Sequence, residues 1–141
     1  MTLGLHDFTG LWSLRRRVEN RMGQGGELDG EASFTANGST LIYAERGILK
    51  IGSAEIAANQ THVWRADANR IHVCFGDGRP FHSFEPGVVA PAARHDCAPD
   101  VYNVSYDFAD WPVWRSHWVV TGPRKDYEMR SEYAPSTDQR P

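Results

Sequence analysis

The chain has 141 residues, of which 40% are apolar, 23% charged and 11% aromatic. These values are typical of one globular domain and exclude a disordered, a fibrous or a multidomain protein. A domain of this length buries enough surface to fold without a disulfide or a structural metal. The formal net charge of -3 argues against a nucleic-acid-binding surface or a polybasic membrane-binding surface.

The N-terminal segment indicates where the protein resides. Residues 1–8 lack the charged and apolar regions of a secretion signal, and the sequence has no apolar run long enough to span a membrane. We therefore expect a cytoplasmic protein. Cys74 and Cys97 are then expected to be reduced thiols, because that compartment disfavours disulfides.

Turn-forming residues recur about every ten positions along the chain, a spacing typical of sandwiches and barrels. Between the turns, apolar residues often alternate with polar ones, which predicts strands with one buried face. The predicted strands cover residues 12–18, 27–35, 41–49, 56–65, 70–75, 81–84, 94–97, 102–108, 113–121 and 126–133. Short helical turns are expected only around residues 3–8 and 108–111.

So many sequential strands joined by short turns favour a meander, and a long meander removes its exposed edges by closing on itself. We therefore predict an all-β fold, a single closed up-and-down antiparallel barrel of about eight to ten strands. The barrel domain is expected to cover residues 1–133. Residues 134–141 show no pattern and are predicted to form a flexible C-terminal tail.

The first predicted strand carries a cation on its apolar face. Arg16 lies on the same face as Trp12 and Leu14, whereas the neighbouring arginines lie on the other face. If that face points into the barrel, Arg16 would contact either the anionic group of a ligand or an internal carboxylate. Arg46 is a similar candidate, although Glu45 cannot pair with it from the opposite face.

Gly10-Leu11-Trp12 resembles the Gly-x-Trp start of the calycin group, which comprises lipocalins, fatty-acid-binding proteins and nitrobindin-like barrels. In that group a basic residue late in the barrel packs over the tryptophan near the closed end. The resemblance implies this role for Arg124 or Lys125.

Three further segments extend the resemblance. They are Asp77-Gly78-Arg79-Pro80-Phe81-His82-Ser83-Phe84, then His95-x-Cys97-x-x-Asp100-x-Tyr102, then Gly122-Pro123-Arg124-Lys125-Asp126-Tyr127. Together they resemble the uncharacterised bacterial family called domain of unknown function 6314, whose members are similar to lipocalin-like barrels. The resemblance extends to about Tyr133 and implies the fold, but it implies no established activity.

The same segments supply a set of polar side chains that could line one wall of a cavity. These are His82, His95, Asp100, Tyr102 and Tyr127. A neutral imidazole beside a carboxylate is suited to acid–base chemistry, yet the same groups serve as hydrogen-bonding contacts for a ligand or for the protein itself. From this set, Arg16 and the tryptophans of the chain, we select six candidate ligand-binding residues: Arg16, His82, His95, Tyr102, Trp114 and Tyr127.

Two cofactor hypotheses remain open. The frames His72-x-Cys74 and His95-x-Cys97 carry ligand types that zinc prefers, but the inward face of the first frame's strand belongs to its apolar residues. A haem would need His82, His95 or His117 as its axial ligand. We predict neither a metal nor a cofactor.

Our main functional hypothesis is a barrel that binds a small hydrophobic or amphipathic molecule. The alternative is a lyase or isomerase that uses a histidine with Asp100 or Tyr102 as acid and base. A third hypothesis is a structural barrel acting as a homodimer, for which the strand that carries Val113 and Val119 is apolar on both sides. We expect no nucleic-acid and no membrane partner.

Overall fold

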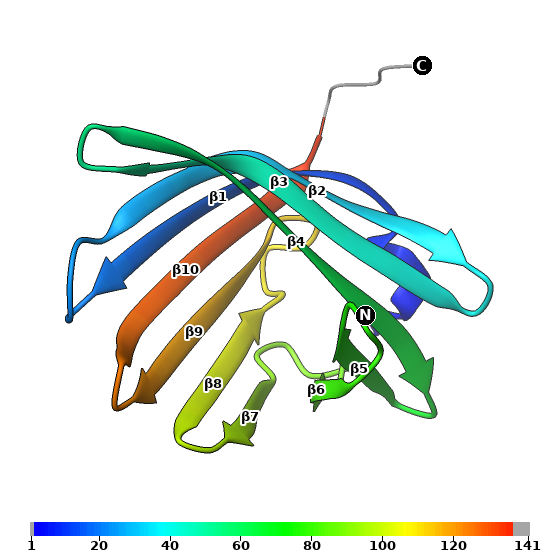
Figure 1. Cartoon of the computed structure of the whole chain (residues 1–141). Helices are drawn as coiled ribbons and strands as arrows, with labels where there is room; N and C mark the ends of the chain where they lie inside the picture. Colours follow the sequence, from blue (N-terminus) through cyan, green and yellow to red (C-terminus); the bar gives the residue numbers. More distant parts are fainter. Residues whose placement is uncertain (1, 137–141) are drawn as a thin grey trace.

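The computed structural model describes residues 2–136 (Figure 1). Ten strands follow one short 3-10 helix, which confirms the predicted all-β fold. The elements are η1 (Leu5–Phe8), β1 (Gly10–Asn20), β2 (Gly26–Asn37), β3 (Thr40–Ile51), β4 (Ala54–Asp67), β5 (Arg70–Phe75), β6 (Pro80–Phe84), β7 (Ala92–Cys97), β8 (Asp100–Asp107), β9 (Trp114–Gly122) and β10 (Lys125–Pro135). All the predicted strands are present, and most extend by a few residues beyond the predicted bounds.

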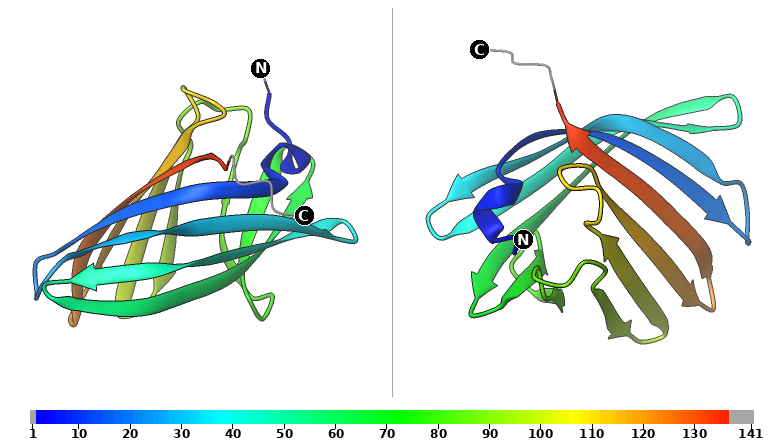
Figure 2. Two further views of the ribbon diagram at one scale, coloured as in Figure 1. Left: turned by 90° about the horizontal axis from the view of Figure 1, so that it is seen from above. Right: turned by 180° about the vertical axis from the view of Figure 1, so that it is seen from behind.

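The strands form one antiparallel up-and-down sheet in the order β6-β5-β4-β3-β2-β1-β10-β9-β8-β7. The sheet curls so that β6 and β7 come together, as the views in Figure 2 show, but these two strands share no backbone ladder. The barrel is therefore nearly closed, where the sequence predicted full closure. Side chains join the two edges instead, since the ring of Phe81 on β6 lies 5.1 Å from the ring of His95 on β7. His82 of β6 also lies 2.7 Å from the Tyr106 hydroxyl of β8, the strand next to β7.

One end of the barrel is closed by an aromatic plug, which we define as Phe8, Trp12, Phe34, Trp64, Phe108, Trp111 and Trp114. Phe8 of η1 is fully buried and its ring contacts five aromatic rings, of Phe34, Trp64, Phe108, Trp111 and Trp114. The indole N–H of Trp12 donates to the carbonyl of Phe8 at 2.8 Å and holds η1 against β1. The helix thus covers the end of the barrel where β1 begins.

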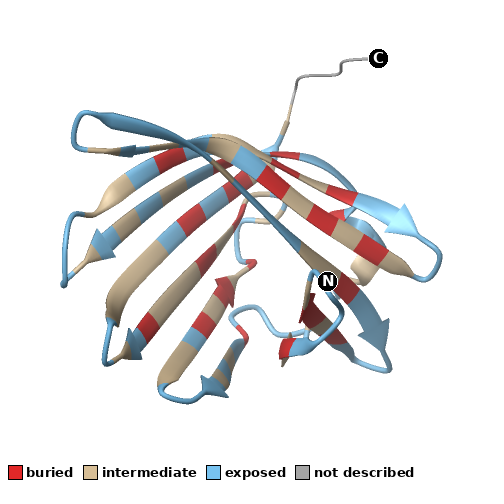
Figure 3. Ribbon diagram, in the orientation of Figure 1, coloured by how far each residue is buried: buried red, intermediate tan, exposed pale blue. Residues whose placement is uncertain are grey.

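The buried residues alternate along the strands, as Figure 3 shows, because every second side chain points inward. The strand β4 departs from this pattern. Its residues 54–61 pair with β3 alone, since the pairing with β5 begins at His62. The β3–β4 hairpin therefore extends past β5 at the end opposite η1 (Figure 1).

Three local expectations need correction. Residues 108–113 form hydrogen-bonded turns instead of helix, since Pro112 has no backbone N–H to donate. Strand β10 reaches Pro135, which pairs with Trp12, so it enters the segment expected to be a tail. Ser136 also donates its backbone N–H to Leu11. The remaining positions of the expected tail, 137–141, lie outside the described residues.

The basic residue expected over Trp12 is also misplaced. Lys125 begins β10, whereas Trp12 pairs with the last residue of that strand. At about 3.3 Å per residue, these positions lie roughly 30 Å apart. Lys125 contacts Asp100 and Tyr102 at the opposite end of the barrel.

Within residues 2–136, no helix has the length and apolar character needed to cross a membrane.

The plug predicts a large effect of truncating its central ring. We expect Phe8→Ala to lower the free energy of unfolding by about 3–5 kcal/mol, because a buried ring is replaced by a cavity. The matched control is Val89→Ala, which removes a side chain that is 60% exposed and should change stability by less than about 0.5 kcal/mol. Urea denaturation of both variants measures this difference, and equal losses would contradict the assigned role of Phe8.

Candidate functional site

A buried ion pair spans the barrel interior. The guanidinium of Arg16 on β1 donates to both carboxylate oxygens of Glu45 on β3, at 2.6 and 3.0 Å. Strand β2 lies between these two strands, and it presents small residues, Gly30 and Ala32, where the side chain of Arg16 crosses. A Cβ at Gly30 would clash with the backbone of Arg46, so no larger residue fits there. Gly30 therefore permits the close approach of β2 to β3, the strand that carries Glu45.

Three hydroxyl groups surround this ion pair, those of Tyr43, Ser131 and Tyr133. We define the interior polar cluster as Arg16, Tyr43, Glu45, Ser131 and Tyr133. Tyr43 donates to Glu45 at 2.6 Å, and the two tyrosine hydroxyls lie 2.9 Å apart. Ser131 accepts from the Arg16 Nε at 2.7 Å. Burial alone would raise the pKa of Glu45, but the hydrogen bonds and charge of Arg16 outweigh burial and hold that pKa below 4.5. Both charges are therefore paired and hydrogen-bonded.

A cavity of about 220 Å³ lies beside this cluster inside the barrel. Its wall is part polar and part aromatic. The lining residues are Arg16, Tyr43, Glu45, Gln60, His62, Trp64, Val73, Phe75, Phe81, His82, Tyr102, Tyr106, Trp114, Ser116, Trp118, Tyr127, Met129 and Tyr133. The stacked rings of Trp114 and Tyr133, 3.8 Å apart, join the aromatic plug to the polar cluster. Residues far apart in the sequence thus form one continuous surface that is part polar and part aromatic.

A β-bulge places two consecutive residues in this wall. The pairing of β5 with β6 shifts between Val73 and Cys74, and Phe81 and His82 are consequently both buried and both line the cavity. Burial, with smaller contributions from His62 and His95, lowers the pKa of His82 to about 3. The imidazole of His82 is therefore neutral at physiological pH. Burial also raises the pKa of its partner Tyr106, which stays protonated.

Two nitrogen atoms of residues that line the cavity have no hydrogen-bond partner within residues 2–136. They are Nδ1 of His82 and Nε1 of Trp114. Both residues are buried, since His82 is 7% exposed and Trp114 only 1%. A buried polar atom without a partner costs about 1–3 kcal/mol. Each of these two nitrogens therefore lacks one hydrogen bond that a further group could supply.

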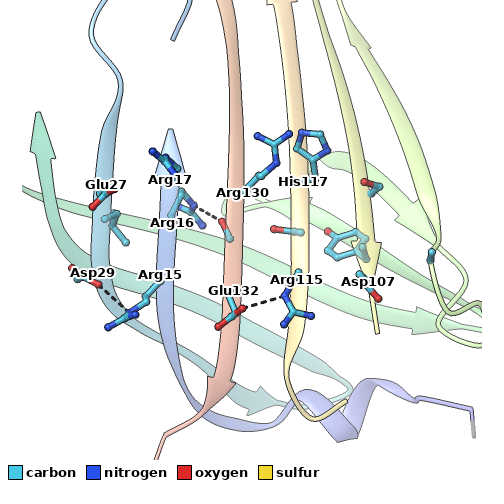
Figure 4. Close-up of a pocket in the computed structure, with 16 residues that line it drawn as sticks. Arg15, Arg16, Arg17, Glu27, Asp29, Asp107, Arg115, His117, Arg130 and Glu132 are labelled. Carbon is cyan, nitrogen blue, oxygen red and sulfur yellow. Dashed lines mark hydrogen bonds and ion pairs between the residues drawn. The ribbon is translucent and has the colours of Figure 1, made fainter. Parts of the chain in front are cut away.

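A second hollow, of about 870 Å³, lies on the outer face of β2, β1, β10, β9 and β8 (Figure 4). It is larger than the interior cavity, but two of its arginines pair with acidic side chains of the same surface. Arg15 lies 3.6 Å from Asp29, and Arg115 donates to Glu132 at 3.1 Å. We favour the interior cavity as the functional site, because basic and acidic side chains alternate in the outer hollow and give it no excess of one charge.

A comparison with known protein families identifies the family of this chain. The model of a family of unknown function, DUF6314, matches residues 8–135. The chain belongs to the DUF6314 family. This confirms the resemblance drawn from the motifs. No curated protein matches the chain.

Two solved structures share the fold of this DUF6314 protein. An S-type phycobiliprotein lyase from Guillardia theta superposes with a TM-score of 0.66 at 9% identity, covering 96% of this chain and 92% of the lyase. A protein of unknown function from the DUF3598 family of Nostoc punctiforme gives a TM-score of 0.57 at 8% identity, covering 94% of this chain but 48% of that one. At these identities the likeness establishes the lipocalin-like barrel fold alone.

Five of the six predicted site residues of the DUF6314 protein line the interior cavity: Arg16, His82, Tyr102, Trp114 and Tyr127. The sixth, His95, lies behind Phe81, with the two ring centroids 5.1 Å apart. The carboxylate that contacts Arg16 is the internal one of Glu45, which was one of the two alternatives. Arg46 is a wrong candidate for the interior, because it faces outward and pairs with Glu31.

Sequence reasoning missed several residues of the site, notably Tyr43, Glu45 and Tyr106. Leu41, Tyr43 and Glu45 alternate along one face of the predicted strand, and this pattern indicates that Glu45 points to the same side as the two apolar residues. No local signal linked that carboxylate to Arg16, because the partners lie on strands that are not adjacent in the sheet.

The residues named in the zinc and haem hypotheses make other contacts in the structure. Within residues 2–136, no group of three or more His, Cys, Asp and Glu side chains could hold a metal ion. His72 contacts Ser83 on the neighbouring strand at 2.6 Å, and both cysteines are free, Cys74 buried and Cys97 exposed. His117 pairs with Glu128 instead of facing the cavity.

The buried ion pair predicts a large effect of neutralising one partner. We expect Glu45→Gln to lower the free energy of unfolding by about 3–5 kcal/mol, because Arg16 then stays buried without a counter-charge. The matched control is Glu31→Gln, which disrupts the exposed pair with Arg46 and should cost at most about 1 kcal/mol. Thermal and urea denaturation compare the two variants, and similar losses would contradict the importance of the interior pair.

The neutral state of His82 predicts a pH dependence of stability. As the pH falls below 6.5, the unfolded chain gains a proton on His82, whereas the folded protein gains it only near pH 3. Stability should therefore fall across this range by up to about 1.4 kcal/mol per pH unit from this group.

His82→Phe should remove that contribution, whereas His6→Gln, at an exposed position, should leave it unchanged. His62 shifts in the same direction, so a smaller slope remains in both variants. Denaturation curves between pH 6.5 and 4.5 measure the slopes, and an unchanged slope in His82→Phe would contradict a neutral buried imidazole.

Proposed function

We propose that the protein binds one compact, partly aromatic small molecule inside the barrel. The cavity of about 220 Å³ lies below the usual range of ligand sites, which begins near 300 Å³. It exceeds the cavity of about 150 Å³ that accommodates benzene in a protein core. The ligand should therefore have the size of one or two fused rings.

The observation that carries this proposal is the pair of unpartnered nitrogens in one wall. His82 and Trp114 line the same cavity, and neither Nδ1 of His82 nor Nε1 of Trp114 has a hydrogen-bond partner in the described chain. A packed core avoids this arrangement, since each such atom costs free energy. A ligand that bonds to them recovers that cost, while Phe81 and Trp118 offer ring surfaces for its apolar part.

The acid–base alternative receives less support. It required a histidine hydrogen-bonded to Asp100 or Tyr102, but His82 contacts Tyr106, and Tyr102 and Asp100 both contact Lys125. A histidine with a pKa of about 3 is also a weak base at neutral pH. The similarity to a phycobiliprotein lyase is a fold-level analogy, so it supports a ligand-binding barrel and does not transfer the lyase activity.

Homodimerisation stays a prediction, and the free edge of β4 favours a second copy as the partner. Residues 54–61 carry backbone donors and acceptors on the side away from β3. Two copies of this segment in antiparallel pairing would place Glu55 opposite Gln60 and Ala57 opposite Ala58, with no like charges facing each other.

The cytoplasmic location and the absence of nucleic-acid and membrane partners rest on the sequence alone and also stay predictions.

The direct test is native mass spectrometry of the protein purified from its own host. We expect one small molecule per chain, released on denaturation. The cavity-filling variant Ser116→Leu should lose it, because Ser116 is buried in the cavity wall. Ser105→Leu is the matched control, since Ser105 lines the outer hollow on the next strand. Retention of the adduct in Ser116→Leu, or an adduct-free wild-type protein that also binds none of the bicyclic probes described below, would overturn the proposal.

A further inference from the structure

The hydrogen bond between His82 and Tyr106 determines which nitrogen of the imidazole carries the proton. A neutral imidazole has one N–H donor and one acceptor nitrogen. If Nε2 carried the proton and donated to Tyr106, the buried Tyr106 hydroxyl would need another acceptor, and no other hydrogen bond of that hydroxyl occurs within residues 2–136. If Tyr106 donates to Nε2, both groups of this pair are satisfied. We therefore assign the proton of His82 to Nδ1.

This assignment makes both unpartnered atoms hydrogen-bond donors. Nδ1–H of His82 now has the same requirement as Nε1–H of Trp114, which is always a donor. The charged acceptors of the wall are already engaged, since the oxygens of Glu45 accept from Arg16 and Tyr43. Neither donor therefore has an acceptor among the described residues.

The charge balance of the cavity narrows the ligand further. Arg16 and Glu45 neutralise each other, and His82 is uncharged, so the wall carries no excess positive charge. An anionic ligand would lose its hydration and meet the carboxylate of Glu45. A neutral acceptor avoids this cost.

We infer that the cavity selects a neutral, compact ring system bearing a hydrogen-bond acceptor, of the carbonyl class found in cyclic ketones, lactams and lactones. The acceptor oxygen bonds to Nδ1–H of His82, to Nε1–H of Trp114 or to both. This inference rests on the proposed function and adds the chemical class of the ligand.

Three bicyclic probes of one shape test the inference on the wild-type protein. Indane has no hydrogen-bonding group, 1-indanone adds an acceptor, and indole offers a donor. Calorimetry measures the three affinities. We expect 1-indanone to bind about tenfold or more tightly than indane, because two donors gain a partner, and indole to bind no more tightly than indane.

The variant Trp114→Phe keeps an aromatic ring and removes one donor. The preference for 1-indanone over indane should fall by about fivefold, the value of one neutral hydrogen bond. The ratio of affinities is compared within each protein, so a general change in packing or stability affects both probes alike. An unchanged ratio in this variant would remove Trp114 from the acceptor site.

The outcomes separate the inference from the proposed function. Equal binding of the three probes would leave a ligand-binding barrel but overturn the acceptor class. Tighter binding of indole would mean that Nδ1 of His82 is an acceptor, and would also overturn it. Failure of all three probes, with no adduct on the host-purified protein, would overturn both.

The tautomer is measured independently by long-range ¹⁵N–¹H correlation spectra of the whole protein, with the signals of His82 assigned from their loss in His82→Phe. We expect a protonated Nδ1 and an unprotonated Nε2. In Tyr106→Phe the bond that fixes the tautomer is gone, so the Nε2–H form should gain population. A wild-type spectrum with the proton on Nε2 would overturn the inference.

Discussion

The reach of Arg16 across strand β2 to Glu45 is the constraint on which the rest of the interior depends. The guanidinium crosses β2 beside two small residues, Gly30 and Ala32, and Gly30 has no space even for a methyl group. Because both charges are buried, each requires its partner and the surrounding hydroxyls of Tyr43 and Ser131. This requirement fixes the polar cluster in the middle of the barrel.

The cluster divides the interior into two regions with different chemistry. Towards η1 the space is filled by tightly packed rings around Phe8, which is fully buried. Away from η1 the rings of Phe81 and Trp118 face a cavity instead of packing against a further layer. Trp114 belongs to both regions, because it packs against Phe8 in the plug and also lines the cavity. The aromatic residues thus serve as core at one end and as cavity wall at the other.

The sequence allowed the strands to be predicted well, because turn residues and period-two alternation are local signals. The same alternation placed Arg16 inside the barrel, but it could not identify Glu45 as its partner, since that contact depends on how the sheet curls. The shared burial of Phe81 and His82 was not predictable from alternation, which assigns neighbours to opposite faces. A bulge in the pairing with β5 reverses that assignment locally. The unsatisfied donors were likewise invisible, because a missing partner is a property of the assembled cavity.

A crystal structure of the protein with 1-indanone would test most directly whether the barrel binds a neutral acceptor through the donors of His82 and Trp114. We expect the ketone in the interior cavity, with its oxygen within about 3.2 Å of Nδ1 of His82 or Nε1 of Trp114. A ketone bound elsewhere, such as in the outer hollow, or both nitrogens bonded to protein groups, would contradict it.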